Sequence, residues 1–141
     1  MKKIVLFAAV LSATWTTSLL WTCQVRAAAD DEARRPEFYT SHVKPIFAAN
    51  CYRCHGGMNH RGNLNLATKA MILKGGKHGA VIVAGDPANS LLMKLIRHEG
   101  PAKDPMPMPP PPRAKLSDAD IAIVERWIRA GAIMPDDAPK P

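Results

Sequence analysis

The chain has 141 residues, with 19 Lys and Arg against 12 Asp and Glu, and a formal net charge of +7. This length is enough for one domain, and a hydrophobic content of 47% excludes a wholly disordered protein. The basic residues are scattered through the sequence without interleaved aromatic residues, which disfavours nucleic-acid binding.

The N-terminus has the pattern of a secretory signal peptide. Lys2 and Lys3 give a basic start, residues 4–21 are mainly apolar, and residues 27–29 are three alanines that suit signal peptidase. We therefore predict a signal peptide over residues 1–29. The alternative is an uncleaved anchor, because residues 4–21 are just long enough to span a bilayer.

Cleavage after Ala29 changes both the charge and the cysteine count. It leaves 16 basic and 12 acidic residues, a net charge of +4, and two cysteines, Cys51 and Cys54. A lipidated Cys23 is disfavoured, because Trp21 and Thr22 stand where a lipoprotein signal needs small residues. We predict a periplasmic or otherwise exported protein, with a membrane tether as the alternative.

The exported part is predicted to have three sections. Residues 30–36 are a charged, flexible lead-in, residues 37–134 form the domain, and residues 135–141 are a loose polar tail. Pro36 suits the first turn of a helix, whereas Pro45 is expected to kink or break that helix.

The middle of the domain alternates between short helices and loops. We predict loop over residues 56–66, a helix over 67–74 that ends at two glycines, and a helix over 88–98. An extended run covers residues 80–84. Residues 101–112 hold seven of the 13 prolines and are expected to be extended.

The clearest helix begins after Ser117, which can cap it together with Asp120. Glu125 and Arg129 are spaced to pair across one turn, and Gly131 ends the helix. Its apolar face is formed by Ile121, Val124, Trp127 and Ile128. The domain as a whole is therefore predicted to be mostly α.

One motif carries chemistry: Cys51-Tyr52-Arg53-Cys54-His55. A C-x-x-C-H run in an exported protein is the attachment signature of c-type haem. Two thiols three positions apart can add to the two vinyl groups of one porphyrin, and the adjacent histidine is then the proximal iron ligand. The sequence therefore predicts one covalent haem on Cys51 and Cys54, with His55 on the iron.

Other uses of this cysteine pair fit less well. A structural zinc site needs two further ligands in a regular pattern, and a thioredoxin-like pair needs a βαβ context. A disulfide across two residues would stabilise little, because the closed loop is short. A porphyrin, by contrast, would supply apolar surface to a domain with few aromatic residues.

The sixth iron ligand is expected to be a methionine from the proline-rich segment, Met106 or Met108, because the flanking prolines restrict the backbone there. Met58 is too close to His55 to reach the opposite side, and Met71 and Met93 are expected to be core residues. Histidine alternatives are His60, His78 and His98.

The sequence resembles the planctomycete-type cytochrome c domain, a class I-like c-type cytochrome, from about Phe38 to Met134. The similar stretches, in chain order, are Val43-Lys44-Pro45-Ile46-Phe47, Cys51-Tyr52-Arg53-Cys54-His55-Gly56, Leu73-Lys74-Gly75-Gly76, residues 83–92, Met108-Pro109-Pro110, Lys115-Leu116-Ser117 and residues 127–132. The resemblance implies thioethers at Cys51 and Cys54, proximal His55, and a distal methionine from Met-Pro-Pro. That motif favours Met108, with Met106 as the alternative.

The resemblance also implies a small cytochrome c-like helical fold wrapped around one haem, with long proline- and glycine-rich loops. The expected function is single-electron transfer between redox protein partners, without enzymatic activity. The alternatives are a haem enzyme or sensor with an open sixth position, and a haem-containing interaction module of a larger exported complex.

Overall fold

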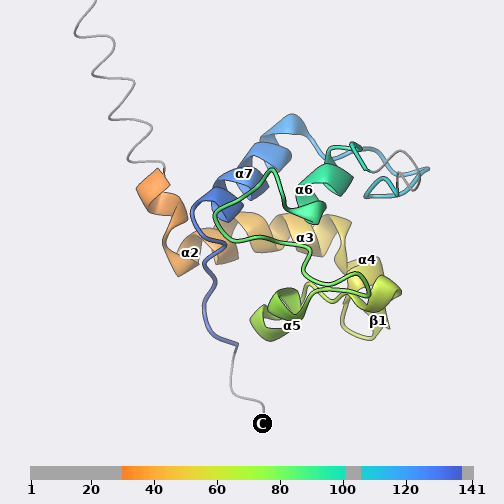
Figure 1. Ribbon diagram of the computed structural model, residues 1–141, viewed down its shortest axis with the longest axis horizontal. Helices are drawn as coiled ribbons and strands as arrows, with labels where there is room; N and C mark the ends of the chain where they lie inside the picture. Colours follow the sequence, from red (N-terminus) through yellow and green to blue (C-terminus); the bar gives the residue numbers. More distant parts are fainter. Residues whose placement is uncertain (1–29, 101–105, 138–141) are drawn as a thin grey trace, which may run out of the picture. The chain divides into compact units, whose positions relative to one another are not determined.

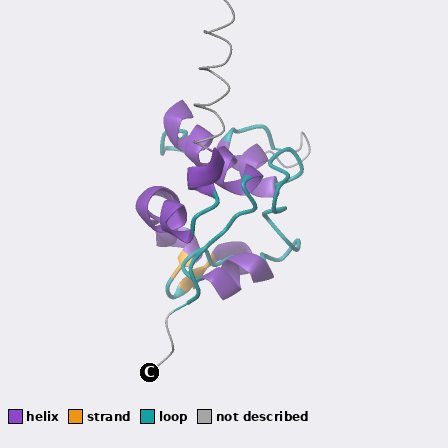
Figure 2. Cartoon of the chain, turned by 90° about the vertical axis from the view of Figure 1, so that its left-hand side faces the viewer, coloured by secondary structure: helices purple, strands orange, loops and turns teal. Residues whose placement is uncertain are grey.

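The computed structural model describes residues 30–100 and 106–137. These residues form helices joined by loops, and their strand is confined to one short piece, β1 (Figure 2). Ala33 and the residues that follow it make up one compact unit. The prediction of a mostly α fold is therefore confirmed.

Residues 30–33 differ from the prediction. Residues 30–33 were expected to be a flexible lead-in, but they are helical, and the side chain of Ala33 is fully buried in the core. The sequence did not reveal this contact, because charged residues on either side of Ala33 are typical of an exposed segment. The methyl group of Ala33 is nevertheless small enough to pack inside the domain.

The first long helical segment is continuous through Pro45. It consists of α2 (Pro36–Phe38), a π-helical segment (Tyr39–Val43) and α3 (Lys44–Asn50). The predicted interruption takes the form of a π-helical turn, and the helical segment continues without a break. Pro45 lies in the first turn of α3, where its missing N–H is tolerated.

Short elements follow α3. They are α4 (Tyr52–His55), β1 (Asn59–His60), a 3₁₀ turn (Arg61–Asn63) and α5 (Lys69–Lys74). Residues 59 and 60 bridge back to residues 56 and 55, a small hairpin that the sequence did not predict. The helix predicted over residues 67–74 is present as α5. Thr68 caps its start, and Gly75 ends it at a φ of 76°.

The helix α6 (Leu91–Ile96) is shorter than the predicted range of 88–98. Its start is delayed because the preceding loop uses the buried Ser90. The Ser90 hydroxyl accepts a hydrogen bond from the Val83 amide at 2.9 Å and donates to the Asp86 carbonyl at 2.8 Å. These bonds hold residues 83–90 in a turn that cannot continue the helix backwards.

The helix α7 (Asp118–Arg129) has the predicted caps. The Asp120 amide donates to the Ser117 hydroxyl at 3.1 Å, and that hydroxyl donates to the Asp120 carboxylate at 2.8 Å. Glu125 and Arg129 pair across one turn, and Gly131 follows the helix with a φ of 108°. All of these features are encoded locally, which is why the sequence predicted them.

The core is organised around Trp127 on α7, which is fully buried. Its ring lies 5.4 Å from that of Tyr39 and 6.0 Å from that of Phe47, measured between centroids. The Trp127 indole N–H donates to the Ile133 carbonyl at 2.8 Å, so its polar atom is satisfied. This packing joins α7 to the N-terminal helical segment (Figure 1).

The helix α6 also packs against α7. Arg97, just after α6, donates a hydrogen bond to the Glu125 carboxylate at 2.7 Å, and both side chains are partly buried. Met93 and Ile96 of α6 contribute to the same core as Trp127. The position of α6 is thus set by α7.

Two residues after Met134 are bonded to the domain. Asp137 accepts hydrogen bonds from the backbone amides of Lys69 and Ala70, at 2.7 and 2.9 Å, and so caps the first turn of α5. Asp136 pairs with the Lys69 ammonium at 2.8 Å. The loose tail predicted over residues 135–141 is therefore wrong for Asp136 and Asp137, because their carboxylates bind the positive end of a distant helix. Residues 138–141 lie outside the described part of the chain.

This anchor predicts a difference between neighbouring acidic residues. Asp137→Ala removes a bidentate cap and should lower the free energy of unfolding by about 1 kcal/mol. Asp136→Ala removes only an exposed ion pair and should lower the free energy of unfolding much less. Urea unfolding of the two variants measures both values, and equal effects would contradict the capping role.

Candidate haem site

The compact unit contains a cavity of about 670 Å³. Its volume lies within the range of roughly 300–1,000 Å³ that is usual for cofactor sites. One wall comes from residues 50–66, and the other comes from α6 and residues 106–116. Eight aliphatic side chains line it: Leu64, Leu66, Val81, Leu91, Leu92, Leu95, Ile96 and Leu116. The cavity therefore suits a large, mostly apolar guest.

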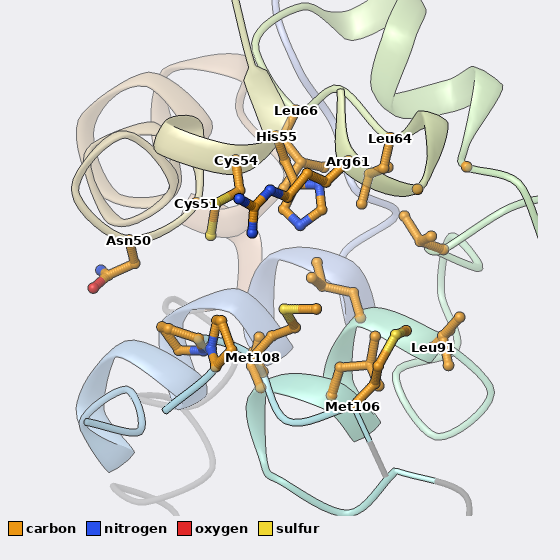
Figure 3. A pocket seen from close by; sticks show the side chains of 18 of the residues that line it. Asn50, Cys51, Cys54, His55, Arg61, Leu64, Leu66, Leu91, Met106 and Met108 are labelled. Atoms are coloured by element: carbon orange, nitrogen blue, oxygen red, sulfur yellow. The ribbon is translucent and has the colours of Figure 1, made fainter. Parts of the chain in front are cut away.

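The C-x-x-C-H motif lies on one wall of this cavity, where α3 passes into α4. Cys51, Cys54 and His55 all line the cavity, and the imidazole of His55 points into it (Figure 3). The helical turn is closed by hydrogen bonds from the amides of Cys54 and His55 to the Cys51 carbonyl, at 3.0 and 2.8 Å. The turn places both thiols and the imidazole on the same side of the backbone.

The two thiols are free and partly buried. Burial raises the pKa of the Cys51 thiol to about 11, and the nearby Arg113 guanidinium opposes this rise. The thiol is therefore protonated at neutral pH. The Nδ1 atom of His55 is buried without a hydrogen-bond partner among the described residues. The orientation of the imidazole ring would therefore be set by packing and by a partner bound in the cavity.

Met108 lies on the facing wall. Its side chain is across the cavity from His55, whereas Met106 lies farther along the same wall toward Leu91 (Figure 3). The Met108 amide donates to the Leu95 carbonyl at 3.0 Å, which ties this segment to α6. Met106 is 36% exposed and has a φ of 23°. The structure thus places Met108 more favourably than Met106 to reach a group held by His55.

The other candidate ligands lie in different places. Met93 and Met134 are buried in the core, and Met58 is 98% exposed at the tip of the small hairpin. Met71, His60 and His98 do not line the cavity, whereas His78 does. Of the methionines predicted as ligands, the cavity brings Met106 and Met108 together with the motif, and of the histidines it brings His78.

The cavity lining is strongly basic. It includes Arg53, Arg61, Lys77 and Arg113 and contains no Asp or Glu. All four cations are exposed to solvent at the margin of an apolar space. The fold therefore gathers charges that seemed scattered in the sequence, and the resulting field favours an anionic group.

Sequence reasoning missed this charge segregation, although a signal for it was present. Residues 38–85 contain six Lys and Arg and no Asp or Glu. The overall net charge concealed the pattern, because acidic residues before and after this segment offset it. Counting charges along the chain would have shown that the segment carrying the motif is positive throughout.

Comparison with known families now bears on this site. Residues 51–112 match the model of the planctomycete cytochrome C family. The match begins at the first cysteine of the motif, covers both walls of the cavity and ends in the proline run. No match was found among curated proteins or among solved structures.

This match indicates a haem-binding c-type cytochrome domain in this part of the chain. More specifically, residues 51–112 belong to the planctomycete cytochrome C family. The resemblance inferred from the short motifs is therefore confirmed. Family membership also implies haem c as the covalently bound cofactor.

The residues present fit this cofactor. The cavity offers two thiols beside an imidazole, a thioether across from them, apolar walls for the ring and cations for two propionates. A zinc site fits less well. Within residues 30–100 and 106–137, no group of three or more His, Cys, Asp or Glu could hold a metal ion.

The described residues contain no helix long and apolar enough to cross a membrane. Residues 1–29, with the predicted signal peptide or anchor, lie outside the described part of the chain.

Proposed function

We propose that this chain is an exported monohaem c-type cytochrome that carries single electrons between redox proteins. The observation that supports this best is the facing pair, with His55 beside two cysteines on one wall and Met108 on the other. When bound, haem c supplies an iron that exchanges one electron at a time. The exported location and the absence of enzymatic activity are part of the proposal.

In this proposal, four residues of the cavity have defined roles. Cys51 and Cys54 would hold the haem covalently, so that it would stay bound in either oxidation state. His55 and Met108 would both bind the iron, which would leave no open position for oxygen or peroxide chemistry. A methionine ligand also favours a higher reduction potential than a second histidine would.

The aliphatic walls would exclude water from a bound haem, while the basic margin remains exposed. A low-polarity surrounding strengthens every charge interaction inside it. The four cations at the margin offset the propionates and leave a positive face. We therefore propose that the physiological partner presents an acidic surface to this side of the molecule.

Covalent haem attachment is the first expected outcome. Protein produced in a periplasm with a c-type cytochrome maturation system should carry the mass of one haem. The double variant Cys51→Ser, Cys54→Ser should lose it, because no thioether can form. Mass spectrometry of the intact protein measures the adduct, and its N-terminal mass also reports whether residues 1–29 are removed.

The chain offers a matched control for this experiment. Cys23→Ser removes the third cysteine, which lies outside the described domain, and should leave the haem adduct unchanged. Wild-type protein without the haem mass would refute the proposed function. Haem retained covalently in the double variant would refute the assignment of the attachment residues.

The second outcome concerns the distal ligand. Met108→Ala should abolish the long-wavelength methionine–iron charge-transfer band of the oxidised protein, lower the reduction potential and allow the reduced protein to bind carbon monoxide. Met106→Ala should leave all three properties close to wild type, because Met106 lies farther along the wall. Visible spectroscopy and redox titration measure these effects.

If Met106→Ala loses the band and Met108→Ala keeps it, the distal ligand is Met106. Carbon monoxide binding by the reduced wild-type protein would instead favour a haem enzyme or sensor with an open sixth position.

The third outcome concerns the positive face. Oxidation of the reduced protein by ferricyanide, a small anion, should be fast at low salt and slow by about tenfold as salt screens the face. The double variant Arg61→Glu, Lys77→Glu should lose both the low-salt rate and most of the salt dependence. Stopped-flow spectroscopy at several ionic strengths measures the rates.

The matched control is Lys44→Glu, Lys115→Glu, which changes the net charge equally at exposed residues outside the cavity lining. It should retain most of the salt dependence. If both double variants behave alike, only net charge matters, and the proposed docking of an acidic partner at the cavity margin is wrong.

A further inference from the structure

Arg113 connects the two walls of the cavity. It follows the proline run, and its guanidinium reaches across to the last turn of α3. Nη1 donates to the Asn50 carbonyl and Nη2 to the Ala49 carbonyl, each at 3.0 Å. The next residue along the chain is Cys51. The segment that carries Met108 is thus bonded directly to the segment that carries the motif.

These acceptors suit an arginine. The carbonyls at the C-terminal end of a helix lack partners within the helix and carry its partial negative charge. A guanidinium offers two N–H groups in a fixed fork, so it can satisfy both carbonyls at once and place a positive charge beside them. Helix α3 therefore presents a ready-made binding site for this one side chain.

The proline run has few other ways to be held. Of residues 107–112, all but Met108 are proline and lack a backbone N–H. The Met108 amide is used in its hydrogen bond to the Leu95 carbonyl, at 3.0 Å. The segment is thus fixed to α6 at Met108 and to α3 at Arg113, with four stiff prolines between the two anchors.

We propose that Arg113 is a positioning residue that holds the Met108 segment across the cavity from His55. It acts through the α3 carbonyls and the proline run, without being an iron ligand itself. This inference rests on the proposed function, because it takes Met108 as the distal ligand. Loss of the Arg113 anchor leaves Met108 tied on the α6 side alone, so its thioether should leave the iron more often.

The test compares Arg113→Ala and Arg113→Lys with Arg129→Ala in the haem-loaded full chain. Arg129 pairs with Glu125 on α7 and does not line the cavity, so its variant also loses an intramolecular ion pair. The readouts are the methionine–iron band as a function of temperature, the rate of carbon monoxide binding to the reduced protein, and the unfolding midpoint from circular dichroism.

We expect Arg113→Ala to lose the band at a lower temperature and to bind carbon monoxide about tenfold faster, as the loss of a charge-assisted hydrogen-bond pair predicts. Arg113→Lys keeps the charge but not the fork and should lie between Ala and wild type. Arg129→Ala should match wild type in both haem readouts. If Arg113→Ala does not load haem, Arg113→Lys decides, and faster carbon monoxide binding supports the inference.

A merely structural role gives a different result. In that case Arg113→Ala lowers the unfolding midpoint while the band and the carbon monoxide rate stay at wild-type values, which overturns the inference. An unchanged Arg113→Lys, where Ala does not load haem, overturns it too. If Met108→Ala itself retains the band, the proposed ligand has failed, and this failure is distinguishable from that of Arg113 alone.

Discussion

The packing of Trp127 is the contact on which the rest of the structure depends. Its buried ring lies against Tyr39 and Phe47, and so it fixes α7 to the N-terminal helical segment. The end of that segment leads directly into Cys51 and His55. On the other side, α7 holds α6 through shared core residues and the Arg97–Glu125 pair. Both walls of the cavity are therefore positioned relative to one aromatic cluster.

This arrangement lets a small domain keep the two proposed iron ligands apart. The proposed ligand on the first wall, His55, belongs to a helical turn closed on the Cys51 carbonyl and is therefore rigid. The proposed ligand on the second wall, Met108, lies in a segment without regular structure, which would be mobile without its anchors. The anchors come from backbone carbonyls of two helices, at Leu95 and at the end of α3. The two helices thus hold in place a loop that has no regular backbone hydrogen bonds of its own.

What the sequence predicted, and what it did not, follows from the range of the interactions. The caps of α7 and the end of α5 depend on residues within a few positions of each other, and these features were predicted. The choice between Met106 and Met108 was left open, because both lie among prolines and the family motif alone favoured Met108. The structure ties the Met108 amide to the Leu95 carbonyl, a contact that no local pattern encodes. The cap that Asp137 supplies to α5 was missed for the same reason.

The prolines show why composition alone was ambiguous here. A chain with 13 prolines looks poorly suited to a packed core, because proline interrupts helices and cannot pair in a sheet. In residues 107–112 the same properties are useful. Each proline narrows the conformations of the unfolded segment, so ordering it costs less entropy, and the missing N–H groups leave few donors to satisfy at the cavity wall. Pro109 is buried, and the rest of the run bridges from α6 toward Arg113. A segment of this composition can remain irregular and still place one thioether, provided that its two ends are bonded to helices.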